Sequence, residues 1–325
     1  MKLFLVLIAL LVLGWGASLW MAARNEAQAR SAYPPLGDFV EVTTGPETTE
    51  TLRLHYVQAG EGPDLVLIHG AGGNVRDFTF DLVDRLTDRY RVTVFDRPGL
   101  GYSDALPGSN TTIADQARLL AQASDQLGLT NPMVLGHSYG SAVALAWGTT
   151  DPVPAVSPSA LILLGGVSNP WDTPPEPLYR GLSSPIIAPV FAPLITAWVP
   201  EDYVRSAIAS VFTPQAMPEG YDDYIGAGLT LQRSVLRENA RQRVNLLPQV
   251  RAMVPDYGAL DMPLEILHGD EDTTVWLTIH SVPLSQQAPD TNLVVMEGVG
   301  HAPHHAEPET VTDAIDRAAT RAGLR

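Results

Sequence analysis

Short apolar runs recur along the chain from residue 65 onward, and segments with helical spacing lie between them. A short continuous apolar run is typical of a strand that is buried on both faces of a sheet. Such runs occupy residues 65–68, 92–95, 133–135, 160–164, 264–267 and 293–296. Helical spacing is clear at residues 76–88 and from about residue 113 to residue 127.

Two earlier segments, residues 39–42 and 52–57, alternate apolar and polar positions. They predict an antiparallel pair of strands at a sheet edge, joined by the turn-rich residues 43–50. Because strands and helices then alternate, we predict an α/β fold: a mostly parallel central sheet with helices on both faces.

The alternation breaks between residues 168 and 254, where no apolar run of the strand type occurs. Prolines crowd the first half of this region, and helical patterns with aromatic residues follow. An insertion of this length is too long for a loop. We therefore expect a helical cap over residues 168–254, which divides the core into residues 38–167 and 255–325.

Residues 3–23 form an uncharged apolar run between Lys2 and Arg24. A helix needs roughly 20 such residues to span a bilayer, and Trp15 and Trp20 lie towards the far end of the run, as interfacial aromatic residues often do. We expect a transmembrane anchor within residues 1–23, a linker over residues 24–37, and a folded domain outside the cytoplasm.

The alternative is a cleaved secretory signal. Ala27-Gln28-Ala29 has the small residues of a cleavage site, and cleavage near Ala29 would leave a secreted or periplasmic protein. The charges of Arg24 and Glu26 are unusual ahead of such a site.

Composition narrows the range of partners. The 325 residues are 45% hydrophobic, and 20 basic residues stand against 36 acidic ones, for a net charge of −16. Nucleic acid is not expected as a partner, since phosphate binding needs clustered cations. The chain has no cysteine, which excludes disulfides, thiolate metal sites and a cysteine nucleophile. The sequence leaves the oligomeric state open.

The most informative motif is Gly136-His137-Ser138-Tyr139-Gly140, which lies between an apolar run and a small-residue helical pattern. This layout is that of a nucleophile elbow, in which a sharp turn holds a serine in a strained backbone conformation. Gly136 and Gly140 would leave room for the turn. By itself the motif also fits an ordinary glycine turn.

A serine hydroxyl needs a base within hydrogen-bond reach and a third group that orients the base. His268-Gly269-Asp270-Glu271-Asp272 follows one late apolar run, and Gly300-His301 follows the next. Both segments come just past the carboxyl ends of predicted strands, at the edge where ligands of open α/β sheets bind.

Taken together, these segments resemble a capped enzyme of the α/β-hydrolase fold over roughly residues 38–320. The resemblance is carried by His69-Gly70, by the run from Asp96 to Asp104, by the serine motif, by the His268–Asp272 segment and by Gly300-His301, in the order of that superfamily.

The resemblance implies a role for each site residue. Ser138 would be the nucleophile, His301 the base that later acts as an acid, and Asp272 the carboxylate that orients His301. The resemblance favours Asp272 over Asp270, which would be a turn carboxylate. It also implies that the backbone N–H groups of Tyr139 and Ala71 form the oxyanion hole, and that His69 is structural.

The resemblance is incomplete at two positions. The superfamily often has a glutamate where this chain has Ala306, and a glycine where it has Ser141. Neither position belongs to the triad, but both leave the subfamily undecided.

No cofactor and no metal are predicted. His301, His304 and His305 have a spacing that a metal site could use, but no nearby carboxylate pattern completes a ligand set.

Serine at the elbow disfavours the epoxide and haloalkane hydrolases, which use aspartate there. It fits hydrolysis of a small, partly apolar ester or related acyl compound. It fits equally a carbon–carbon bond hydrolase of dienoic ring-fission products, a cofactor-free perhydrolase or, with the triad unused, a catalytically silent binding protein. Trp171, Phe191, Trp198 and the cap tyrosines suggest an apolar pocket, although each could equally belong to the core of the cap.

Overall fold

The computed structural model describes residues 1–44, 50–108, 111–150 and 156–325. The turn expected at residues 43–50 therefore lies mostly outside the described residues. Eight strands form one sheet in the order β1-β2-β4-β3-β5-β6-β7-β8. The strands are β1 (Asp38–Thr43), β2 (Thr51–Ala59), β3 (Asp64–Ile68), β4 (Arg91–Phe95), β5 (Met133–His137), β6 (Ala160–Leu164), β7 (Leu264–Gly269) and β8 (Thr291–Met296).

The sheet is antiparallel only where β2 pairs with β1 and β4, and it is parallel from β4 to β8. This confirms the predicted α/β fold. The central strands β3, β5, β6 and β7 are buried along their whole length. β8 differs from the expectation of a buried strand, because it is the last strand of the sheet and leaves Val295 half exposed.

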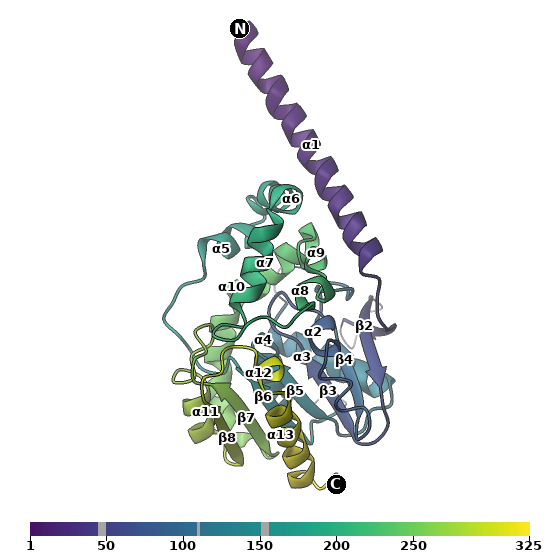
Figure 1. The fold of residues 1–325 in the computed structure, drawn as a ribbon, viewed down its shortest axis with the longest axis vertical. Helices are drawn as coiled ribbons and strands as arrows, with labels where there is room; N and C mark the ends of the chain where they lie inside the picture. The colour runs from purple at the N-terminus through teal and green to yellow at the C-terminus, as the bar shows by residue number, and fades with distance from the viewer. Residues whose placement is uncertain (45–49, 109–110, 151–155) are drawn as a thin grey trace.

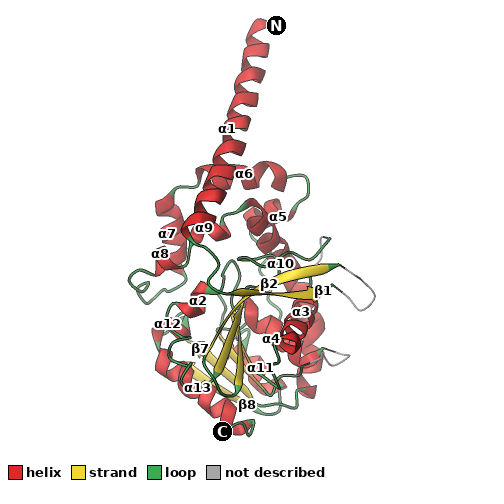
Figure 2. Cartoon of the chain, turned by 90° about the vertical axis from the view of Figure 1, so that its right-hand side faces the viewer, coloured by secondary structure: helices red, strands yellow, loops and turns green. Residues whose placement is uncertain are grey.

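Helices cover both faces of the sheet (Figure 2). On one face, α3 (Ile113–Gln126), α4 (Tyr139–Thr149) and α11 (Ser281–Gln287) contribute to a large apolar cluster. On the other face, the segment around α2 (Arg76–Thr79) packs with α13 (Pro308–Arg321). The start of α3 follows from its sequence, since the Thr112 hydroxyl and the Asp115 carboxylate form a capping box.

The helix predicted over residues 76–88 is shorter than expected, because α2 ends at Thr79. The Tyr224 hydroxyl donates to the Thr79 carbonyl at 3.1 Å, and the Val83 N–H, which a regular helix would direct to that carbonyl, donates to Phe78 instead. A cap residue 145 positions away in the chain thus competes for the helix hydrogen bond.

Between β6 and β7, in place of further strands, the described chain forms a helical layer above the sheet (Figure 1). Its helices are α5 (Pro177–Ser183), α6 (Ala188–Trp198), α7 (Glu201–Ser210), α8 (Tyr221–Tyr224), α9 (Ala227–Thr230) and α10 (Arg233–Met253). A 3₁₀ helix over Val254–Ala259 leads back to β7, and α12 (Pro303–Ala306) precedes α13. We refer to residues 168–254 as the cap.

The N-terminal helix α1 (Lys2–Ala32) projects far from the rest of the molecule (Figure 1). It is longer than its apolar run and continues through residues 24–32, which the sequence assigns to a linker. These residues are helical because the cap holds them. Asn25 Nδ2 donates to the Thr196 carbonyl at 2.9 Å, and Glu26 forms an ion pair with Arg233 at 2.7 Å.

The turn between β5 and α4 brings three backbone segments unusually close together. Ser138 has φ 54° and ψ −115°, a region that residues other than glycine rarely adopt. A Cβ atom at Gly136 would lie 2.4 Å from the Gly140 backbone, and one at Gly140 would lie 2.1 Å from the Ile68 carbonyl oxygen. Real Cβ atoms do not approach backbone so closely, so both glycines are required.

We therefore expect Gly140→Ala to lower the free energy of unfolding by about 3 kcal/mol or more, because α4 must move away from β3. Urea denaturation of the purified protein measures this change. Gly258→Ala is the matched control, since its Cβ would lie 3.8 Å from the Gln287 carbonyl oxygen, an ordinary contact. Equal stability of the two variants would contradict the proposed constraint.

Candidate active site

Ser138 stands at the carboxyl end of β5 and precedes the first residue of α4. Its N–H donates to the Leu164 carbonyl of the neighbouring strand β6 at 2.9 Å, which fixes the turn to the sheet. The side chain lies at the N-terminus of an 11-residue helix, where the helix dipole favours developing negative charge.

Asp272 and His301 meet at the same edge of the sheet, in the loops after β7 and β8. His301 Nδ1 and Asp272 Oδ2 are 2.7 Å apart. The other carboxylate oxygen accepts the Thr274 and Val275 N–H groups at 2.8 and 2.9 Å. Asp270 lies apart from this pair, and its carboxylate accepts the Gly298 N–H at 2.7 Å. The structure thus brings Asp272, and not Asp270, to the imidazole.

The environment keeps this pair in the ionisation states that a triad needs. Burial alone would raise the pKa of Asp272, but hydrogen bonds from His268, His301 and the Val275 N–H outweigh it and hold this pKa far below its ordinary value. Burial lowers the pKa of His301 below its ordinary value of 6.5, although the hydrogen bond to Asp272 opposes the change. His301 is therefore neutral at pH 7 and can accept a proton.

Two glycines allow these groups to approach the elbow. A Cβ atom at Gly165 would lie 3.3 Å from His301 Nδ1, and one at Gly70 would lie 3.2 Å from Ser138 Cβ. In the described part of the chain, no hydrogen bond joins the Ser138 hydroxyl to His301. Hydrogen bonds between catalytic groups are often long without substrate and shorten in the complex.

The loop after β3 and the start of α4 each supply a free backbone donor beside the serine. Among the described residues, neither the Ala71 N–H nor the Tyr139 N–H donates to a protein acceptor. Both residues line the same cavity as Ser138. The two N–H groups are thus available for an oxyanion, as the resemblance implies.

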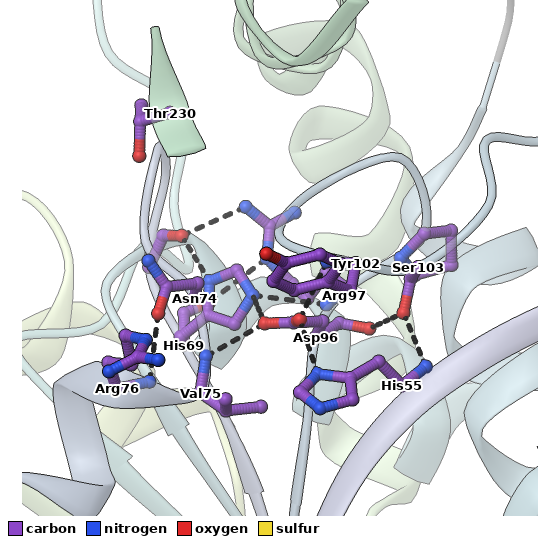
Figure 3. A network of polar contacts seen from close by, with 12 residues as sticks. His55, His69, Asn74, Val75, Arg76, Asp96, Arg97, Tyr102, Ser103 and Thr230 are labelled. Carbon is purple, nitrogen blue, oxygen red and sulfur yellow. Dashed lines mark hydrogen bonds and ion pairs between the residues drawn. The ribbon is translucent and has the colours of Figure 1, made fainter. Parts of the chain in front are cut away.

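A fully buried arginine holds this loop in place (Figure 3). Arg97 donates to the carbonyl oxygens of His69 and Gly70, both at 3.0 Å, and its guanidinium lies over the Tyr139 ring, 4.2 Å from the centroid. Burial lowers the pKa of Arg97 to about 10, so it remains charged at pH 7. The arginine therefore connects the two segments that present the free N–H groups.

His69 belongs to the same network, and both of its ring nitrogens bond to backbone groups. Its Nε2 accepts the Arg97 N–H at 3.0 Å, so its Nδ1 carries the proton and donates to the Gly70 carbonyl at 2.9 Å. Burial lowers its pKa to about 4. Nearby, Asp96 accepts hydrogen bonds from Val75 N–H, Tyr102 N–H and His55 (Figure 3).

A cavity of about 550 Å³ opens over Ser138. Its walls come from the cap and from the loop after β7, and they are mostly apolar. Besides Ser138, Ala71 and Tyr139, they include Trp171, Tyr179, Arg243, Leu246, Trp276 and His280. Among the aromatic residues that suggest a pocket, Trp171 thus lines the cavity, whereas Phe191 and Trp198 are exposed on the outside of the cap.

His280 is a cavity residue that the sequence does not reveal, because it stands in no motif. Its Nδ1 accepts the Ser168 and Asn169 N–H groups at 3.2 and 3.1 Å, and burial lowers its pKa to about 4. A neutral imidazole that accepts at Nδ1 must carry its proton on Nε2. His280 can therefore offer a neutral N–H donor to a bound molecule.

The structure also supplies a carboxylate that the sequence does not place near His304 and His305. Asp77 Oδ1 lies 3.3 Å from His304 Nε2 and 3.1 Å from His305 Nε2, and it accepts the Tyr221 hydroxyl at 2.7 Å. His137, beside the serine, faces the other oxygen at 3.6 Å and donates to the His301 carbonyl at 2.8 Å. The cluster therefore joins the elbow to the loop of His301.

Asp77, His304 and His305 are residue types that bind divalent metals, and their donor atoms are close enough together for one ion. The hydrogen bonds already satisfy the carboxylate, however. His304 Nδ1 has no partner among the described residues, whereas a metal-bound histidine usually donates its second ring N–H. The arrangement is better described as a buried carboxylate surrounded by donors.

Comparison with known proteins gives the family of the chain. The sequence model of the alpha/beta hydrolase family matches residues 65–314, and the chain therefore belongs to this family. A 2-hydroxy-6-oxononadienedioate/2-hydroxy-6-oxononatrienedioate hydrolase of Escherichia coli is 32% identical over 124 residues, which are 37% of this chain. The chain spans 42% of the length of that relative.

Solved structures share the fold. A thermophilic esterase from Thermogutta terrifontis is 22% identical, with a TM-score of 0.70 over 88% of this chain and 99% of its own. A bacterial membrane phospholipase A is 21% identical, with a TM-score of 0.61 over 98% of this chain and 99% of its own. At these identities the likeness shows the fold alone.

The lowered pKa of His301 predicts the acid limb of the pH profile. Turnover should fall as the pH drops through this pKa, because the protonated imidazole cannot act as a base. We expect kcat/KM for a soluble ester to fall with a midpoint below pH 6.5. Circular dichroism over the same pH range is the control for unfolding. A midpoint above 6.5 in folded protein would contradict the assignment.

The buried carboxylate of Asp77 predicts a pH-dependent contribution to stability. Burial alone would raise its pKa, but the neighbouring imidazoles, His304 first among them, hold this pKa well below its ordinary value of 3.8. Because the folded pKa is depressed, the stabilisation is fully present above about pH 4 and is lost as the pH falls below that value.

Asp77→Asn should therefore lower the free energy of unfolding by about 3 kcal/mol at pH 7. The difference from the natural protein should shrink below pH 4. Urea titrations at several pH values measure it, with Asp270→Asn as the control at a more exposed carboxylate. A difference that grows in acid would contradict the depressed pKa.

Proposed function

We propose that this protein is a serine hydrolase that cleaves carboxylic esters, or related acyl bonds, through an acyl-enzyme. The proposal rests on one observation. Ser138, in a strained backbone conformation, lines an apolar cavity together with two residues whose backbone N–H groups are free, and the buried Asp272–His301 pair lies at the same edge of the sheet. In this scheme Ser138 attacks the acyl carbon while His301 takes its proton. Asp272 orients the imidazole and stabilises its charged form.

The Ala71 and Tyr139 N–H groups then stabilise the tetrahedral oxyanion. Collapse of this intermediate breaks the bond to the leaving group, which takes the proton from His301 and departs as an alcohol. Water, activated by the same histidine, hydrolyses the acyl-Ser138 ester and restores the serine. The apolar walls of the cavity suit a partly apolar acyl or alkyl group.

A second candidate is hydrolysis of a carbon–carbon bond in a dienoic ring-fission product. It is supported by the 32% identity to the E. coli hydrolase named above. Parallel assays with p-nitrophenyl esters and with a dienoic ring-fission substrate separate the two reactions. The esterase proposal requires the larger kcat/KM for the esters.

We further propose that α1 is retained as a membrane anchor and is not cleaved as a signal. The described residues contain one straight helix that is long and apolar enough to cross a bilayer, and it is α1. Cleavage near Ala29 would remove the buried residues Ser18, Ala22 and Ala29 and the Glu26 partner of Arg233. Retention keeps these contacts with the cap. The membrane phospholipase A shares the fold over 98% of this chain, including part of this helix.

Ser138→Ala tests the nucleophile. We expect ester turnover to fall by on the order of 10⁴-fold or more, because a residual enhancement from the oxyanion hole is all that remains. A fluorophosphonate probe should label the natural protein and not the variant. Ser141→Ala is the matched control, since its hydroxyl donates to the Gly136 carbonyl and does not line the cavity. Near-normal turnover of Ser138→Ala would refute the proposed mechanism.

A further inference from the structure

The outer face of α6 is apolar and exposed, which is unusual for a protein surface in water. No charged residue occurs in Ala188–Trp198. Large apolar side chains on this helix and on the turn before it are exposed: Ile186, Ile187, Val190, Phe191, Leu194 and Trp198. From Ile187 to Trp198 their spacing is that of one helix face, and the opposite face packs into the cap through Ala188, Ala192 and Thr196. A contiguous exposed apolar surface of this kind marks an interaction site.

α6 lies against α1, and its position on α1 determines what can cover the exposed face. The two helices lie beside one another in both views (Figures 1 and 2). Trp198 Nε1 donates to the Ser18 hydroxyl at 2.9 Å. The cap is thus fastened to the lower part of α1, whereas residues 3–13 of the helix are exposed almost throughout.

The length of α1 then sets the depth of α6. The uncharged run of residues 3–23 is about 31 Å long at about 1.5 Å per residue, close to the thickness of the hydrocarbon core. Ser18 lies five residues before the end of the run, and hence about 8 Å inside it. When α1 spans a bilayer, the part of α6 that contacts Ser18 is at the boundary between headgroups and acyl chains.

α6 itself cannot span the membrane. Its 11 residues extend only about 17 Å, and it meets α5 at a bend of 117°. The chain becomes acidic immediately afterwards, with Glu201 and Asp202 at the start of α7. A short apolar helix that packs one face on the cap, exposes the other and is followed at once by acidic residues suits a position in the plane of the interface.

We propose that the exposed face of α6, with Ile186 and Ile187, is seated in the headgroup–acyl boundary of the bilayer that α1 spans. The cap then binds the membrane surface directly, in addition to the anchor. This inference rests on the proposed anchor but not on the proposed hydrolase activity. The net charge of −16 does not oppose it, since the contact is apolar and α1 already holds the protein at the membrane.

The arrangement has a consequence for the substrate. Tyr179 of α5 lines the cavity over Ser138, and the same side chain packs on the cluster that includes Ala192 of α6. One short helix thus separates the membrane-facing surface from the cavity. A cap seated in this way favours esters that partition into the bilayer.

The absence of cysteine from the chain makes a clean test possible. Val190→Cys places a single thiol on α6, and Val295→Cys is the matched control on β8, because the two valines are 47% and 49% exposed. Leu10→Cys reports on the anchor. Each full-length variant is labelled with an environment-sensitive fluorophore and reconstituted into phosphatidylcholine vesicles, with nitroxide lipids labelled near the headgroup or near the chain end.

We expect a blue shift and nitroxide quenching at position 190, strongest for the nitroxide near the headgroup. Position 10 should be quenched most by the nitroxide near the chain end, and position 295 by neither. If position 190 behaves like position 295 while position 10 is quenched, the seating of α6 is wrong although the anchor stands. If position 190 is blue-shifted but not quenched, protein such as a second copy covers the face, and the proposal is equally overturned.

Two further outcomes distinguish the seating of α6 from the proposed anchor and from the proposed hydrolase activity. Absence of quenching at position 10 refutes the anchor and the seating of α6 together. Quenching at position 190 in a protein that hydrolyses no ester supports the seating and refutes only the hydrolase proposal. Circular dichroism of the three labelled variants, relative to the natural protein, shows that labelling leaves the fold intact.

Discussion

The close approach of β3, β5 and α4 at the elbow is the constraint on which the site depends. Gly140 lies directly against the Ile68 carbonyl, and Gly136 lies against Gly140. This packing leaves Ser138 in a conformation that costs free energy, and the surrounding sheet supplies the hydrogen bonds that maintain it. Ser138 is therefore held by the core of the protein and not by a mobile loop.

The same region is stabilised electrostatically by groups that do not react. Among the described residues, no carboxylate accepts a hydrogen bond from the buried Arg97, which directs its N–H groups to carbonyl oxygens and amide side chains. A buried charge is tolerated when its hydrogen bonds are satisfied. In this protein those bonds position both segments that offer free N–H groups. On the other side of the elbow, Asp77 is a buried carboxylate that accepts hydrogen bonds, and His137 connects it with the His301 loop.

The cap connects these two parts of the molecule to the N-terminal helix. Tyr179 faces the cavity, α6 presents an apolar face to the outside, and α6, α9 and α10 contact the second half of α1. The cavity over Ser138, the cap and the N-terminal helix form one continuous assembly. Removal of α1 would expose its contact surface on the cap, so the rest of the chain is not simply the same protein without its N-terminal helix.

The sequence alone was sufficient for the α/β fold and for the order of its strands along the chain. Buried parallel strands are continuous apolar runs, and this signal is local. It also placed Ser138, Asp272 and His301 at strand ends, where the parallel sheet brings them to one edge. Roles for Ala71 and Tyr139 could be inferred only from resemblance. Every residue except proline has a backbone N–H, so the residue type does not identify a backbone donor.

Tertiary structure alone decided the remaining features. Asp77 meets His304 and His305 across more than 220 residues, and no local pattern indicates such a contact. Residues 24–32 look like a polar linker, yet they are helical because Asn25 and Glu26 find partners in the cap. α2 ends early because Tyr224 takes a carbonyl of its last turn. In the last two cases a hydrogen bond from a distant residue overrides the local preference of the chain.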